Sequence, residues 1–330
     1  MRRQYETRNL IAHAAAVVAL PLIMFAAMPA AAQTYPSKPM RMIVGFPVGG
    51  GSDAFARALG QRLGDQMGQQ VIVDNRPGAN GNIGAEVAAK LPADGYNMLI
   101  VSTSQAINAS LYTNLNYNLS KNFTAIALVG SVPNTVVVRA DLPAKNVKDL
   151  IQLGKSERLT YASSGLGSPE HLAGELFCRQ AGIEMVHVPY KGSGQSVTDL
   201  VGGHVDSGFN TLPSVINMAK QGKVKILAVT TKTRTPTNPD IPTVAESGLP
   251  NYEMSTWYAL VVPSGTPGDL VKRLNEEVNK AIASAEMKAR LNAIGADAAE
   301  VNTPAQAGAF IESEIAKYRT IVHEAGIKNE

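Results

Sequence analysis

Residues 40–73 read MRMIVGFPVGGGSDAFARALGQRLGDQMGQQVIV, and this stretch decides the fold class. The apolar run at residues 40–46 predicts a short buried strand. A helix is expected next, with Ser52 or Asp53 as its N-cap, because apolar residues recur at helical spacing after them. A second strand is expected over residues 70–73. The order strand, helix, strand is typical of an α/β fold.

The same alternation continues along most of the chain and predicts mostly parallel sheets. A second block of this alternation follows after the long segment 123–139. Further strands are expected at residues 98–102, 159–162, 185–188, 205–209 and 224–230. Further helices are expected at residues 83–90, 147–157, 169–181, 195–201 and 212–221, and in the tail at 270–284, 285–293 and 304–323.

The tail helices have no strands of their own to cover, so they are expected to pack back on the first block. This arrangement gives two lobes, one formed by residues 33–134 and 256–330, the other by residues 135–255. Two strands would cross between the lobes and permit hinge closure around a cleft.

The N-terminus has the order of a secretory signal. Arg2, Arg3 and Arg8 precede an apolar run at residues 10–27, and small residues at 28–32 resemble a peptidase site. The apolar run approaches membrane-spanning length, so a transmembrane anchor is the alternative. The small residues favour a cleaved signal peptide at residues 1–32 and a periplasmic location.

Charge and cysteine content exclude several classes of protein. The chain has a formal net charge of +3, and residues 33–330 alone are closer to neutral, whereas nucleic-acid binding needs a basic field. Cys178 is the single cysteine, so neither an internal disulfide nor a cysteine zinc site can form. No metal or cofactor is expected.

The loop at residues 46–53, Phe-Pro-Val-Gly-Gly-Gly-Ser-Asp, is the strongest local feature. Its glycines let the backbone approach a ligand, and the following helix start offers unpaired N–H groups that attract anions. No P-loop lysine follows the glycines. A singly charged carboxylate therefore fits better than a polyphosphate, unless the glycines only form a tight turn.

A second loop, Ser163–His171, also joins a strand to a helix, with Ser168 as the expected N-cap and Pro169 at the first helical position. Ligands of α/β sheets bind at the carboxyl ends of strands, where both loops lie. Ser168 and His171 could also suggest a secreted hydrolase, but no G-x-S-x-G motif is present. The protein is therefore not expected to be an enzyme.

Several short sequence motifs together resemble those of the receptors of tripartite tricarboxylate transporters, often called the Bug family. The resemblance covers essentially the whole chain after residue 32. It is carried by the stretches at residues 43–53, 75–84, 92–96, 188–192, 240–246 and 263–267. It departs from the family at Val48, where a small residue is common, and at Asn80, where glycine is common.

The resemblance implies a type II periplasmic-binding-protein fold, with two α/β lobes, a central ligand cleft and two crossover strands. It also implies that backbone and hydroxyl donors capture the ligand. Carried over by position, the ligand-binding residues are Phe46, Pro47, Gly49, Gly50, Gly51, Ser52, Asp53, Ser102, Thr103, Ser104, Ser163, Ser164, Gly165, Ser168, His171, Tyr190 and Asn210.

The expected function is that of a periplasmic solute-binding receptor, acting as a monomer. It would capture a small organic carboxylate and deliver it to a two-component membrane permease of the tripartite tricarboxylate type. Aliphatic dicarboxylates, aromatic acids, amino acids and citrate-like acids all remain open. Because the cleft lacks an obvious cation, a neutral or amide-bearing ligand is the alternative.

Overall fold

The structure is a computed structural model that describes residues 35–324, 326 and 327. Lys38–Glu330 form one compact unit, and the fold is that of this unit. The expected signal peptide at residues 1–32 lies outside the described residues. None of the helices in the described part of the chain combines the length and apolarity needed to span a bilayer.

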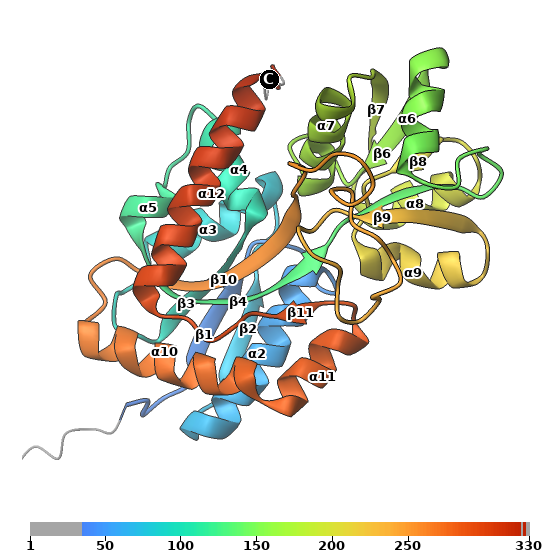
Figure 1. Cartoon of the computed structure of the whole chain (residues 1–330). Helices are drawn as coiled ribbons and strands as arrows, with labels where there is room; N and C mark the ends of the chain where they lie inside the picture. The colour runs from blue at the N-terminus through green and yellow to red at the C-terminus, as the bar shows by residue number, and fades with distance from the viewer. Residues whose placement is uncertain (1–34, 325, 328–330) are drawn as a thin grey trace, which may run out of the picture. The chain divides into compact units, whose positions relative to one another are not determined.

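The first sheet is built from both ends of this unit (Figure 1). Its strand order is β11-β4-β10-β3-β1-β2. Strands β1, β2 and β3 pair in parallel, whereas β10 and β11 pair antiparallel with their neighbours. The strands are β1 (Met40–Val44), β2 (Val71–Asn75), β3 (Asn97–Ser102), β4 (Phe123–Pro133), β10 (Ser255–Pro263) and β11 (Asp297–Ala298).

The second sheet comes from the middle of the chain and has the order β7-β6-β8-β5-β9. The pairs β6–β7 and β6–β8 are parallel, and β5 runs antiparallel to β8 and β9. The strands are β5 (Thr135–Arg139), β6 (Leu159–Ser163), β7 (Met185–Pro189), β8 (Ser207–Gly208) and β9 (Val224–Val229).

The prediction of mostly parallel sheets is wrong. Of the nine strand pairs in the described residues, five are antiparallel. The cause lies in β4, β5 and β10, which the alternation of strands and helices did not reveal. These strands are buried over most of their length, so their apolar runs lack a period. No helix lies between β4 and β5 or between β9 and β10.

The helices agree with the expected ones to within a few residues, with two additions. The additions are α4 and α5, whose polar sequences hide their helical character. Among the described residues the helices are α2 (Gly51–Met67), α3 (Asn82–Ala89), α4 (Thr103–Leu111), α5 (Leu119–Asn122), α6 (Val147–Ser156), α7 (Pro169–Ala181), α8 (Ser193–Val201), α9 (Leu212–Lys220), α10 (Gly268–Ala283), α11 (Ala285–Ala293) and α12 (Pro304–Glu324), with a 3-10 turn at Ala79–Gly81.

The tail helices pack on the first sheet, as expected, although β10 and β11 interrupt the tail. Helices α10 and α11 contact α2, and α12 contacts α4 and β4 (Figure 1). A buried network of amides fixes α10 to β4, because Asn275 Nδ2 donates to the carbonyls of Ile126 and Asn302. Helices from the last part of the chain therefore pack with α2 and α4 on the first sheet.

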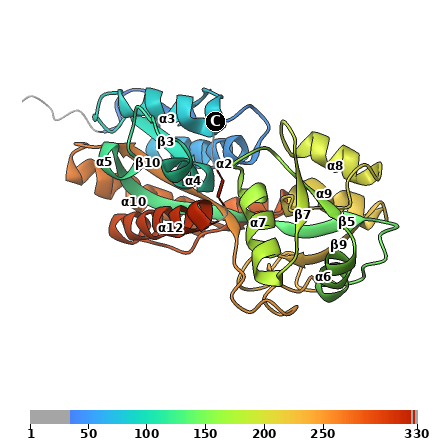
Figure 2. The same cartoon turned by 90° about the horizontal axis from the view of Figure 1, so that it is seen from above.

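The sequence of β5 shows how the second sheet is covered on both faces. Val136 and Val138 belong to the large core cluster, and Val137 between them belongs to a separate cluster under α8 and α9. Successive side chains on a strand point to opposite faces, so a run of three valines fills both cores. Figure 2 shows α8 and α6 on opposite sides of this sheet.

The chain crosses between the sheets at two places that lie side by side. The first crossing is Asn134, between β4 and β5, and the second leads from Thr230 to β10. The carbonyl of Asn134 accepts hydrogen bonds from the N–H and the hydroxyl of Thr230, at 2.9 and 3.0 Å. Asn134 Oδ1 accepts a further bond from Thr256. The lobe boundaries near residues 135 and 255 remain a prediction, and the division of the strands into two sheets at these crossings supports it.

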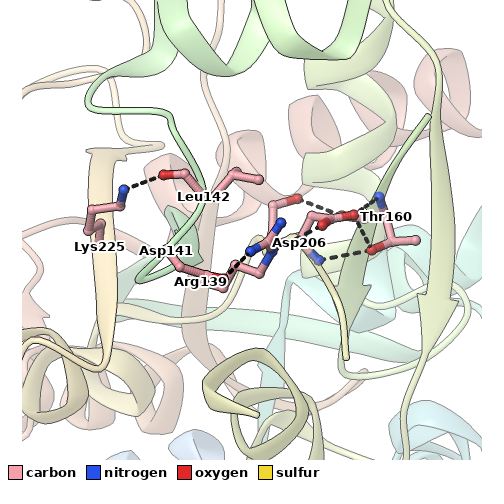
Figure 3. A network of polar contacts seen from close by, with 7 residues as sticks. Arg139, Asp141, Leu142, Thr160, Asp206 and Lys225 are labelled. Atoms are coloured by element: carbon pink, nitrogen blue, oxygen red, sulfur yellow. Dashed lines mark hydrogen bonds and ion pairs between the residues drawn. The ribbon is translucent and has the colours of Figure 1, made fainter. Parts of the chain in front are cut away.

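A polar network ties the strands of the second sheet together at the end shown in Figure 3. Arg139 forms ion pairs with Asp141 and Asp206. Asp206 Oδ2 accepts hydrogen bonds from the N–H and hydroxyl of Thr160, each at 2.9 Å. Lys225 donates to the carbonyl of Leu142. The charged groups of this network therefore bond to one another or to the backbone.

Candidate functional site

A cavity of about 570 Å³ lies where the two sheets meet, and both contribute its walls. It is found where β1, β3 and β6 end, as expected for ligand sites of α/β sheets. Among the described residues that line it, none is a lysine, arginine or histidine. Any attraction for an anion must therefore come from neutral donors and from the backbone.

The first turns of five helices line this cavity. Unpaired N–H groups at the start of a helix, together with its macrodipole, attract negative charge by about 0.3–1 kcal/mol per helix end. The starts of α2, α8 and α9 have no side-chain cap, so no N-cap side chain occupies their first N–H groups. The start of α9 offers fewer donors, because Pro213 has no N–H and Ser214 N–H donates to the Thr211 carbonyl. The lining residues from these starts are Gly51, Ser52 and Ala54 in α2, Ser102 and Ser104 at α4, Ser168, Pro169 and Glu170 at α7, Gly192, Ser193 and Gly194 at α8, and Thr211, Pro213 and Ser214 at α9.

The N-cap of α2 is Gly50, so the prediction of Ser52 or Asp53 is wrong. Asp53 instead stabilises the glycine loop from behind. Its carboxylate accepts hydrogen bonds from Gly49 N–H at 3.0 Å, Arg57 Nε at 2.9 Å and Asn75 Nδ2 at 3.0 Å. Burial acts to raise the pKa of Asp53, but these hydrogen bonds outweigh it and hold the pKa below its usual value.

The second loop is formed as the sequence predicts at its helix end. Ser168 is the N-cap of α7, and its Oγ accepts a hydrogen bond from His171 N–H at 3.2 Å. Gly165 and Gly167 adopt φ values of 141° and 71°, a region that favours glycine. The loop thereby turns the Ser164 and Ser168 side chains toward the cavity.

Ten of the seventeen residues expected from the sequence line the cavity: Phe46, Pro47, Gly49, Gly50, Gly51, Ser52, Ser102, Ser104, Ser164 and Ser168. The other seven do not line it: Asp53, Thr103, Ser163, Gly165, His171, Tyr190 and Asn210. Whether the ten bind a ligand remains a prediction.

Most polar groups of those seven residues are hydrogen-bonded within the protein, although the buried Asn210 Oδ1 has no partner among the described residues. Thr103 Oγ1 accepts from Trp257 N–H, Tyr190 donates to Asp199, and Asn210 donates to Ser196. The sequence indicated that these residues lie in or near the two binding loops, but it could not show the direction of their side chains. They shape the walls behind the cavity.

Sequence reasoning missed more than half of the lining. Gly192, Ser193, Thr211 and Ser214 follow β7 and β8, so the strand-end rule could have found them. The strand-end rule cannot identify lining residues on antiparallel strands or on distant loops. These residues are Asn80, Val132, Thr256, Tyr258 and Ile294.

Buried His171 and half-buried His187 support the second loop. The rings of His171 and His187 stack with their centres 3.9 Å apart. His171 Nδ1 accepts a hydrogen bond from Gly167 N–H at 3.1 Å, and His187 Nε2 lies 2.7 Å from Ser163 Oγ. Burial lowers the pKa of His171 to about 3, helped by His187, and burial lowers the pKa of His187 to about 4. Both rings are neutral at pH 7.

The neutral pair predicts a loss of stability in mild acid. Below about pH 6.5 the unfolded chain binds protons at these rings, whereas the folded chain does so only near pH 3 to 4. The free energy of unfolding should fall by about 1.4 kcal/mol per pH unit for His171 in this window. Urea unfolding from pH 7 to pH 4.5 measures the slope.

His171→Gln should give a shallower slope than the unchanged protein over the same pH range. His204→Gln, at an exposed histidine, is the control and should leave the slope unchanged. An identical slope for the unchanged protein and His171→Gln would show that the buried ring does not carry this pH dependence.

Comparison with known proteins identifies relatives with the same fold. The chain is 37% identical to the protein BugT of Bordetella pertussis over 308 residues, which cover 92% of this chain and 94% of BugT. It is 36% identical to Rpa4515 of R. palustris, solved with adipate, with a TM-score of 0.81 over 89% of this chain and 99% of that one. MatC of Rhodopseudomonas palustris, solved with bound malate, gives 27% identity and a TM-score of 0.76 over 87% and 100% of the two chains.

These structures confirm the two-lobed α/β fold of periplasmic binding proteins that the sequence motifs imply. The family described as "Tripartite tricarboxylate transporter family receptor" matches residues 55–327. Because this match spans most of the chain and BugT is covered almost completely, the chain belongs to the tripartite tricarboxylate transporter family of receptors.

Proposed function

We propose that this receptor captures a small organic carboxylate in the cavity between the two sheets. The observation that carries the proposal is the convergence of five helix N-termini on a cavity lined by serine and threonine hydroxyls. N–H and O–H groups suit a carboxylate, which only accepts hydrogen bonds when it is ionised. The relatives solved with adipate and malate support the same class of ligand.

The start of α2 is the best position for the ligand carboxylate. Its N-cap is a glycine, so neither a side chain nor a Cβ covers the N–H groups of Gly51 and Ser52. The Tyr258 hydroxyl lies next to Gly51 and can add a third donor. Burial raises the pKa of Tyr258, so its hydroxyl stays protonated.

The geometry gives no support to hydrolysis by Ser168 and His171. Ser168 Oγ accepts its hydrogen bond from the backbone N–H of His171, and the ring nitrogen Nδ1 bonds Gly167 instead. A serine nucleophile needs its base within hydrogen-bond reach of Oγ. We therefore propose a receptor that returns its ligand unchanged.

As in the family description, the partner we propose is a membrane transporter, here a two-component permease that takes the ligand from the receptor. We also propose a periplasmic location, a cleaved signal peptide and a monomeric receptor. Fractionation of cells that express the full chain, followed by mass spectrometry of the N-terminus, tests the location and the cleavage. A chain that stays in the cytoplasm with residues 1–32 attached would contradict the proposal.

A thermal-shift screen of the purified receptor tests carboxylate capture. The panel contains adipate, malate, aromatic acids, amino acids and citrate, each paired with its amide. A ligand at about 100 times its Kd should stabilise the folded protein by about 2.7 kcal/mol, which raises the Tm by several degrees. We expect a shift with at least one acid and none with its amide.

A shift with an amide as large as that with its acid would instead favour a neutral ligand. If no acid shifts the Tm and calorimetry detects no heat of binding, carboxylate capture is contradicted. An ester probe consumed by the purified receptor would contradict the non-enzymatic role.

A further inference from the structure

Glu170 is a feature of the cavity that carboxylate capture does not require. It is the only aspartate or glutamate among the described lining residues. The residue is 5% exposed, on the second position of α7. Its carboxylate accepts hydrogen bonds from two serines and forms no ion pair within the described part of the chain. A buried carboxylate without a cation is costly unless something else compensates for it.

The two oxygens of Glu170 are satisfied unequally. Oε2 accepts a short hydrogen bond of 2.6 Å from Ser164 Oγ. Oε1 lies 3.4 Å from Ser193 Oγ, beyond the usual length of about 2.5–3.0 Å for such a bond. Ser164, Ser193 and Glu170 all line the cavity, so the unused capacity of Oε1 is available to a ligand.

Stabilisation of α7 does not by itself explain this placement. A glutamate in the first turn interacts favourably with the helix macrodipole, and Glu286 has the same position in α11. The Glu286 side chain, however, is 59% exposed and pairs with Arg62. That role needs neither burial nor a place in a cavity wall, whereas Glu170 has both.

Glu170 also lies near the expected carboxylate position. Its charge contributes, after burial, to the raised pKa of Tyr258, which places the two groups within electrostatic range. The Tyr258 hydroxyl in turn lies beside Gly51 at the start of α2. One small molecule can therefore contact the N–H groups of α2 and the carboxylate of Glu170 together.

Building on the proposed carboxylate capture, we infer that the natural ligand is a zwitterion, an amino acid or related amino-carboxylate. Its carboxylate binds at the start of α2, and its protonated amine pairs with Glu170. The amine supplies a shorter hydrogen bond to Oε1 than the 3.4 Å contact with Ser193 Oγ, and the positive charge that the described lining does not provide. A dicarboxylate would instead bring a second negative charge toward Glu170, where like charges repel.

Calorimetry with matched acids tests this inference on the purified full chain. The probes are α-amino acids and three straight-chain series from propanoate to hexanoate, which end in an amine, a carboxylate or a methyl group. At the chain length that binds most tightly, we expect the amino acid to bind about tenfold or more tightly than the dicarboxylate and the methyl-terminated acid of the same length. Glu170→Gln should weaken amino-acid binding by about tenfold or more and should strengthen dicarboxylate binding.

Two further variants separate ligand pairing from helix stability. Glu286→Gln removes the equivalent charge from α11 and should leave every affinity unchanged. Glu170→Asp keeps the negative charge and should keep the preference for amino acids, even if Glu170→Gln folds poorly. Thermal unfolding of each variant without ligand reports stability separately.

The outcomes distinguish this inference from the proposed function. Tight binding of dicarboxylates and no binding of amino acids would overturn the inference and leave carboxylate capture standing. An amino-acid preference that is equal in Glu170→Gln and the unchanged protein would also overturn it. If no carboxylate of these series or of the thermal-shift panel binds, both proposals fail.

Discussion

Replacement of Gly51 by alanine should weaken binding of the best acid in the panel by about tenfold to a hundredfold. A Cβ at this position would lie 2.3 Å from the Tyr258 hydroxyl oxygen and 3.3 Å from Cζ. The Tyr258 ring cannot move aside easily, because it is 5% exposed and stacks on Phe55 with ring centres 4.3 Å apart. Either the helix start or the hydroxyl must shift, and both are proposed ligand donors. Titration calorimetry measures the Kd.

Gly64→Ala is the matched control for this experiment. Gly64 lies on the same helix outside the cavity, and its added Cβ would be 3.4 Å from the Gln69 carbonyl, an ordinary contact. Its affinity should match that of the unchanged protein. If Gly51→Ala folds normally and binds as tightly as Gly64→Ala, the ligand does not use the start of α2.

Gly84→Ala should lower the free energy of unfolding by about 1–3 kcal/mol, the usual cost of overpacking. Gly84 lies in α3, and a Cβ there would meet Gly45 Cα at 2.6 Å and the Arg76 carbonyl at 3.1 Å. These are backbone atoms, so no side chain can rotate away. Because Gly45 directly follows β1, the displaced backbone leads into the glycine loop. Urea unfolding measures the change.

A helical glycine with room for an added Cβ is the control for Gly84. Gly308 lies in α12, and the nearest atom to an added Cβ is Ala125 Cβ at 3.9 Å. Gly308→Ala should raise stability by about 0.5–1 kcal/mol, because alanine restricts the unfolded chain more than glycine. Equal changes for the two variants would contradict close packing of α3 on β1.

Gly51 and Gly84 show how much of the fold could be predicted from the sequence. The pattern predicted a glycine-rich loop at residues 46–53 between a strand and a helix. The structure has a loop between β1 and α2, but α2 already begins at Gly51, so residues 51–53 are helical. The pattern could not show which glycine lies against another part of the chain. Gly51 is needed beside Tyr258, and Gly84 is needed beside Gly45. Each contact joins segments that are far apart in the sequence, so no local pattern reports it.

Contacts between distant segments also explain why the sequence did not reveal the role that we propose for Glu170. Glu170 lies inside the loop Ser163–His171, yet it was not among the expected ligand-binding residues, because its sequence position is that of an ordinary first-turn glutamate. Its meaning comes from Ser193 on α8 and Tyr258 on β10, which the fold brings to the same cavity. The sequence also overestimated His171, whose ring points to Gly167 and His187 instead.

The sequence by itself determined the α/β class, most of the helices, the family and the ends of β1, β3 and β6 as the place to search for a site. These properties follow from local periodicity, helix signals and motifs of neighbouring residues. Only the tertiary structure decided the mixed sheets, the side-by-side crossings at Asn134 and Thr230, and the complete lining of the cavity. The physical reason is that strand pairing and side-chain direction depend on contacts between distant segments, which leave no period in the sequence.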